Sequence, residues 1–262
     1  MISEDIEHKL LSGSPIYIGD CPTYKVSLQD MADNGFTKMQ NVIALMALDD
    51  SSAPKFINGD ENIELSTYSV LAIGVLQDLY KKRQGESHDD MLYDSVLTFL
   101  SLFFRREVCF DENDGFVVKN QKGEPVFVLN ESNYNKFRSV LRCRNCLGDE
   151  GEFDGDNPAN DMVAKLLAKR KMLREKVSNS KKAQGNSDLT TADLISIFAE
   201  AEGMPPEDVY RNYDIYQLNN QFSRLRIMDD YHVNVKALLA GAKSEDIKLR
   251  HWLSKINNKN DE

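Results

Sequence analysis

Two stretches of the chain, residues 66–83 and 88–105, most strongly limit what it can fold into. Their apolar residues recur at helical spacing and cover more than one face of each predicted helix. A helix that is apolar on several sides must be surrounded by other elements, so this pair has to lie inside a folded body. We therefore predict a mainly α-helical protein whose N-terminal domain is built around these two helices.

A small β-meander is predicted between this pair and the next helix, near residues 107–129. Turn signals at 113–115 and 122–123 separate short runs rich in β-branched and aromatic residues. Asn130 then has the character of an N-cap for a helix over ESNYNKFRSVLRCRNCL. Upstream, residues 14–26 are typical of a short strand pair, and Ser27 is a candidate N-cap for a helical stretch broken at Asn34-Gly35.

The charge of the sequence changes abruptly after the helix that follows the predicted meander. Residues 149–156 are acidic, but neither register places glycine and glutamate where a calcium-binding EF-hand loop needs them, so we interpret the run as a solvated loop. A basic helix is predicted over 158–177, and residues 164–182 hold eight Lys or Arg against one Glu. Such a stripe can grip an acidic partner or nucleic acid, but charged faces more often meet water.

The polar segment SNSKKAQGNSD marks the best domain boundary. We predict a helical body over 1–177, a linker over 178–188 and a small helical C-terminal domain over 189–262. Within the last, Gly203 is a candidate helix C-cap, residues 214–240 repeat apolar positions at helical spacing, and 244–256 form a closing amphipathic helix.

The residues that usually carry chemistry do not form a catalytic pattern. No serine-nucleophile elbow, phosphate-binding glycine loop or HExxH pair occurs in the sequence. The one CxxC, Cys143 and Cys146, lacks the second pair of a structural zinc site and lies near the end of a predicted helix, the wrong pole to favour a thiolate. We expect a protein that is not an enzyme and needs no cofactor or metal.

The overall charge limits the class of partner. Lys and Arg number 32 and Asp and Glu 42, so the formal net charge is −10, which argues against a dedicated nucleic-acid binder. No apolar run approaches the ~20 residues that cross a bilayer. The acidic start, MISEDIEHKL, lacks the apolar core of a signal peptide, so we expect a protein that stays in the cytoplasm.

The second half of the chain resembles a known family. Four segments are similar to those of tail assembly chaperones of phages and prophages of Gram-positive bacteria. They are NYNKFRSVLRCRNCL, NPANDMVAKLLAKRKMLREKV, YQLNNQFSRL and KALLAGA. The similarity is strongest over 131–256 and looser over 14–105. It implies a protein of the host cytoplasm that binds the long helical tape-measure protein while the tail is built and is usually left out of the virion.

Aromatic and methionine side chains in the C-terminal helices could cover the apolar helix faces of such a partner. The candidate partner-binding residues are Tyr216, Phe222, Tyr231 and Trp252. The alternative is that these side chains form the core of the small domain itself.

Further alternatives stay open at this point. The chain could be a structural component of the neck or tail, with the meander at 107–129 contacting neighbours, and it could bind itself or other tail proteins. A protein that uses Cys143 and Cys146 for metal or redox chemistry is a third possibility.

Overall fold

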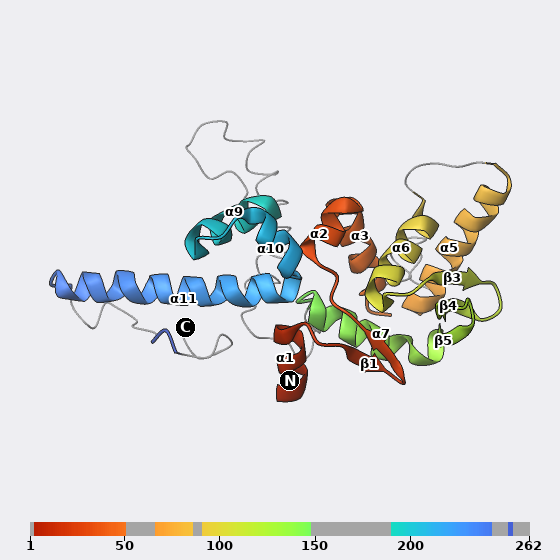
Figure 1. Ribbon diagram of the computed structural model, residues 1–262, viewed down its shortest axis with the longest axis horizontal. Helices are drawn as coiled ribbons and strands as arrows, with labels where there is room; N and C mark the ends of the chain where they lie inside the picture. Colours follow the sequence, from red (N-terminus) through yellow and green to blue (C-terminus); the bar gives the residue numbers. More distant parts are fainter. Residues whose placement is uncertain (1–2, 51–65, 86–90, 148–189, 243–250, 254–262) are drawn as a thin grey trace. The chain divides into compact units, whose positions relative to one another are not determined.

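The computed structural model describes residues 3–50, 66–85, 91–147, 190–242 and 251–253. The chain divides into two compact units, Ile2–Asn145 and Cys146–Glu262, which we describe separately. Helices make up 63% of the described residues, and two small antiparallel sheets lie in the N-terminal unit (Figure 1). This confirms the mainly α fold with a minor sheet. The predicted basic helix at 158–177 and the linker at 178–188 lie outside the described residues.

The two apolar helices predicted at the core are present and pack against each other. They are α5 (Thr67–Arg83) and α6 (Leu92–Phe104), drawn side by side in Figure 1, and α3 (Phe36–Met46) contacts both. α6 contributes three of the six buried aromatic side chains among the described residues of this unit, Phe99, Phe103 and Phe104, and its Val96 and Leu100 are equally inaccessible to solvent. Its apolar character on several faces is explained by elements packed around it.

The chain enters this unit through α1 (Glu4–Ser12) and a short hairpin of β1 (Ile16–Ile18) and β2 (Cys21–Thr23). The hairpin was predicted, whereas α1 was not. α2 (Leu28–Asp33) begins at the predicted cap: the Ser27 hydroxyl accepts a hydrogen bond from the Asp30 amide at 3.0 Å. The chain breaks at Asn34-Gly35 before α3, as the sequence predicts.

The β-meander consists of β3 (Val108–Asp111), β4 (Gly115–Lys119) and β5 (Pro125–Leu129), in the order β3-β4-β5. Both pairings are antiparallel, with Val108 opposite Val118 and Phe116 opposite Leu129, and the register shifts between Val118 and Lys119. β3 packs against α6, so the meander forms one wall of the helical core.

α7 (Glu131–Arg144) closes the unit. Asn130 caps it as predicted, in a capping box with Asn133, and the helix buries Tyr134, Phe137 and Leu141. The Phe137 ring centroid lies 5.5 Å from that of Phe103 in an edge-to-face arrangement, which ties α7 to α6.

The described part of the C-terminal unit is helical. α9 (Thr191–Glu202) begins at a capping box of Thr190 with Asp193 and ends at Gly203, whose φ of 64° gives the predicted C-cap. α10 (Pro206–Asn212) packs against α9, and the single long helix α11 (Ile215–Leu239) follows. Of the predicted helix at 244–256, only 251–253 are described, and these form a turn instead.

Candidate interaction surfaces

The four predicted partner-binding residues fall into two groups. Tyr216 and Phe222 lie half-buried in the first half of α11. Tyr231 and Trp252 meet at one place through His251: the Tyr231 and His251 ring centroids are 5.3 Å apart, and His251 stacks on Trp252 at 5.8 Å. Trp252 is 43% exposed, so this three-ring cluster reaches the surface.

The sides of α11 that carry apolar residues change along its length. At about 100° per residue, its two halves present apolar stripes on roughly opposite sides. The stripe of the first half consists of Ile215, Leu218, Phe222 and Leu225, and that of the second half of Ile227, Tyr231, Val235 and Leu238. One straight helix can therefore bury apolar side chains against two different neighbours.

Several large apolar side chains of this helix face solvent. Met228 is 40% exposed, Val233 56% and Leu239 84%, and Ile197 on α9 is 43% exposed. Sequence reasoning included the methionine side chains of these helices but did not single out Val233, Leu239 or Ile197, because it favoured aromatic residues. The one available signal was that Val233 lies outside the apolar stripe of the second half, on the side of the helix where the first half carries Ile215.

A polar cluster in the N-terminal unit holds the end of α3. Three side chains of α7 spaced four residues apart reach its last carbonyl groups. The Tyr134 hydroxyl donates to the Met46 carbonyl at 2.9 Å, and Arg138 donates to the Leu48 carbonyl at 3.0 Å. Arg142 pairs with Asp49 at 2.6 Å. These groups bond the last carbonyl of α3 and polar groups of the residues that directly follow it, so the cluster has a structural role.

Two pKa shifts follow from this cluster. Burial raises the pKa of the Tyr134 hydroxyl, so this group stays a hydrogen-bond donor. For Asp50, burial opposes the charged form, but hydrogen bonds from Thr67 and Arg138 outweigh it and lower the pKa of the carboxyl. The Arg138 guanidinium lies 2.9 Å from Asp50.

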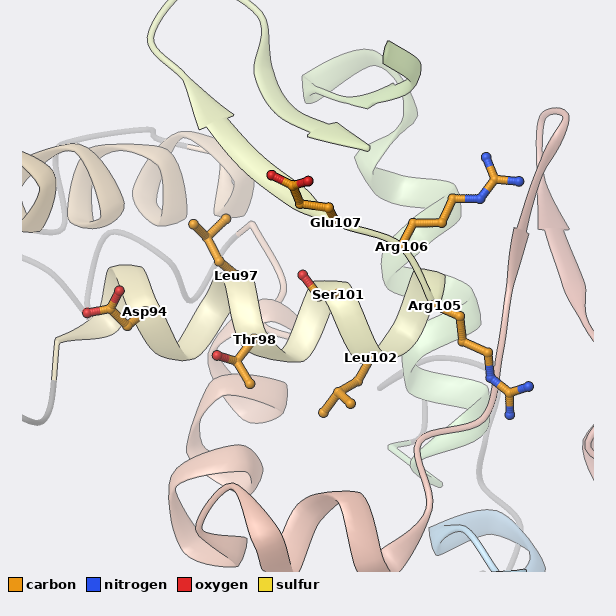
Figure 2. A pocket seen from close by; sticks show the side chains of 8 residues that line it. All are labelled: Asp94, Leu97, Thr98, Ser101, Leu102, Arg105, Arg106 and Glu107. Atoms are coloured by element: carbon orange, nitrogen blue, oxygen red, sulfur yellow. The ribbon is translucent and has the colours of Figure 1, made fainter. Parts of the chain in front are cut away.

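A hollow of about 570 Å³ runs along one side of α6 (Figure 2). Leu97 and Leu102 project to opposite sides of α6, Thr98 and Ser101 lie between them, and charged residues stand at both ends. The lining residues are Asp94, Leu97, Thr98, Ser101, Leu102, Arg105, Arg106 and Glu107. Nothing in the sequence pattern pointed to this hollow, because α6 as a whole is typical of a fully buried helix.

The cysteines do not assemble into a centre within the described residues. Cys143 lies in the last turn of α7, as predicted, and Cys146 follows the helix with a positive φ of 56°. Burial raises the pKa of the Cys21 thiol. In the part of the chain that the structure describes, no three His, Cys, Asp or Glu side chains are placed to hold a metal ion.

One comparison with known proteins bears on the C-terminal unit. Residues 180–257, under a third of the chain, match the family model of the YomV second domain, and α9, α10 and α11 lie within this match. The chain matches no curated protein and no solved structure. Through this segment the chain is similar to phage- or prophage-type proteins of Gram-positive bacteria.

None of the described helices combines the length and the apolar character needed to cross a membrane.

Proposed function

We propose that this phage-type protein is a tail assembly chaperone that binds the tape-measure protein and shields its apolar helices until the tail forms. In this proposal it carries no active site and acts through protein contacts alone. The match at 180–257 supports a phage protein, and the similarity of 131–256 to tail assembly chaperones supports the narrower role.

The observation that carries the proposal is the exposed apolar surface of α11. Val233 and Leu239 lie more than half exposed. Met228 adds a flexible thioether side chain on the side of α11 that Leu239 occupies, whereas Val233 lies about 120° around the helix from Leu239. Exposed apolar side chains grouped on one helix are typical of surfaces that bind protein partners. An amphipathic helix of a tape-measure protein would cover such a surface by packing along α11.

Co-expression tests this proposal directly. The probe is the tape-measure protein of the same phage. We expect it to be a very long helical protein whose reading frame lies immediately downstream of the one that encodes this chain. With the wild-type chain, the tape-measure protein should stay soluble and co-purify. The double variant Val233→Ser/Leu239→Ser should lose most of that binding, whereas Leu11→Ser should retain it, because Leu11 is exposed on α1 in the other unit.

Thermal melts of each variant separate binding from folding. Because Val233 and Leu239 are exposed, we expect each replacement to change the free energy of unfolding by no more than ~0.5 kcal/mol. If the folded double variant binds the tape-measure protein as well as the wild type does, the α11 surface is not the contact. Tyr216, Phe222, Tyr231 and Trp252 are then the next residues to replace.

Mass spectrometry of purified virions distinguishes the chaperone from a structural tail component. A chaperone should be absent from mature particles or present far below the amount of the tail proteins. Stoichiometric presence of this chain would overturn the chaperone role in favour of a neck or tail component.

A further inference from the structure

The hollow lies along a face of α6 that a core helix would not normally expose. α3, α5, β2 and β3 surround the helix on its other sides. On the side facing the hollow, Leu97 and Leu102 are only half-buried, and Thr98 and Ser101 lie between them. Residues 94–105 span about 16 Å along the helix axis, the length of three helical turns.

The two ends of this groove differ in charge. Figure 2 shows Arg105 and Arg106 projecting beyond the C-terminal end of α6 and Asp94 at the other end. Asp94 is neutralised by Lys82, whose Nζ lies 2.7 Å from its carboxylate. Both arginines are exposed, and neither forms an ion pair with another described residue.

Arg105 is held in place by the surrounding structure. Its backbone has a φ of 50°, in the left-handed region, where it ends α6. Its guanidinium lies over the Tyr24 ring at 4.7 Å from the centroid. A cation fixed against an aromatic face loses little conformational entropy when a carboxylate reaches its free edge.

We propose that this groove binds an amphipathic helix of a partner protein, lying antiparallel to α6. In that direction the first turn of the bound helix lies beside Arg105 and Arg106, and its last turn lies beside Asp94. Helices favour acidic side chains in the first turn, so the bound helix presents carboxylates to Arg105 and Arg106. At the other end Asp94 is already paired with Lys82, so the arginines alone set the direction of the bound helix. Apolar side chains at helical spacing on the bound helix cover Leu97 and Leu102.

The same residues argue against other occupants. A phosphate backbone would meet the carboxylates of Asp94 and Glu107 and a chain of net charge −10. The half-buried Leu97 and Leu102 on the two sides of the groove favour apolar side chains over a small polar ligand. The inference goes beyond the proposed function, because the groove lies in the N-terminal unit and needs no contact with α11.

Two designed peptides test this proposal on the full-length chain. Each is an 18-residue stapled helix with leucines four residues apart on one face. One carries two glutamates in its first turn, and the other carries two lysines there. Methyl-labelled protein reports binding through the leucine signals of the groove, assigned by Leu97→Val and Leu102→Val.

We expect the acidic peptide to bind about tenfold more tightly than the basic one and to shift the Leu97 and Leu102 signals. The charge swap Arg105→Glu/Arg106→Glu should reverse this preference. The matched control Lys122→Glu/Lys136→Glu changes the net charge by the same amount at exposed sites outside the groove. This variant should keep the preference for the acidic peptide.

The outcomes are decisive in both directions. The proposal would be overturned if neither peptide bound or if both bound equally. It would also be overturned if the arginine variant and the lysine control showed the same preference between the peptides. Leucine shifts outside the groove alone would also overturn it. Thermal melts establish that each variant is folded before its affinity is compared.

Discussion

At the scale of single residues, Gly115 shows how closely the meander approaches α5. Its φ is 97°, and a Cβ atom there would collide with the Tyr68 hydroxyl and lie 2.9 Å from the Leu129 carbonyl oxygen. A side chain at this position therefore has to displace both an aromatic ring and a neighbouring strand. The glycine is required by space as well as by backbone conformation.

Gly115→Ala should accordingly destabilise the N-terminal unit by about 2–4 kcal/mol, through backbone strain and overpacking together. Urea denaturation measures the loss. Gly123→Ala is the matched control, since its φ is 79° but no atom lies within 4 Å of the added Cβ, so it should cost only about 1 kcal/mol. Equal losses in the two variants would show that the Tyr68 contact is unimportant.

Asp50 gives a second residue-scale prediction, on pH. Because its pKa is lower in the folded chain, its charged form stabilises the fold above the pKa of the unfolded chain, and this contribution disappears as pH falls through the folded value. The carboxylate is half exposed, so the contribution should stay below about 1 kcal/mol. Urea unfolding of the wild type and Asp50→Asn should differ at pH 6, and the difference should shrink as the pH falls below about 4, the usual pKa of an aspartate. A difference that is constant with pH would contradict this.

At the scale of elements, α6 depends on its neighbour for its N-terminal cap. Met91 occupies the N-cap position, and its side chain accepts no hydrogen bond from the first amides of the helix. Instead Asp78 of α5 accepts from the Leu92 and Tyr93 amides, at 2.6 and 3.3 Å. The cap thus also links the two core helices.

Asp78→Ala should cost about 1–2 kcal/mol of stability, because it leaves two helix amides without their acceptor. Asp78→Asn keeps an acceptor oxygen and should cost less. Asp94→Ala in the first turn of α6 serves as the control, since it accepts no hydrogen bond from the helix amides and removes an exposed ion pair with Lys82 and a favourable first-turn charge, together worth about 1 kcal/mol or less. Thermal melts that rank Asp94→Ala as the more damaging change would refute the capping role.

At the scale of the whole molecule, the division into two units predicts that the first folds without the C-terminal helices. A chain lacking residues 188–262 keeps α5, α6, α7 and the meander, which bury the aromatic core among themselves. It should unfold cooperatively, with the near-ultraviolet signal of buried aromatics intact. It should also lose tape-measure binding if α11 supplies the contact. A shortened chain without a cooperative transition would contradict the independence of the N-terminal unit.

Local signals explain which elements were predictable. Ser27, Asn130 and Gly203 act on backbone groups within a few residues of themselves, so their roles as caps follow from sequence alone. The meander and the core helices likewise follow from turn residues and apolar spacing. The short helix α1 escaped prediction because it buries only Leu10 and therefore has little apolar pattern.

The sequence by itself thus determined the helical class, the place of the sheet and most helix ends, because these depend on short-range spacing and capping. Only the tertiary structure decided which faces remain open. The groove on α6 exists because its neighbours stop short of Leu97 and Leu102, and the exposure of Val233 and Leu239 depends on where other elements end. Such exposure is a property of contacts between distant segments, which apolar spacing along one helix does not encode.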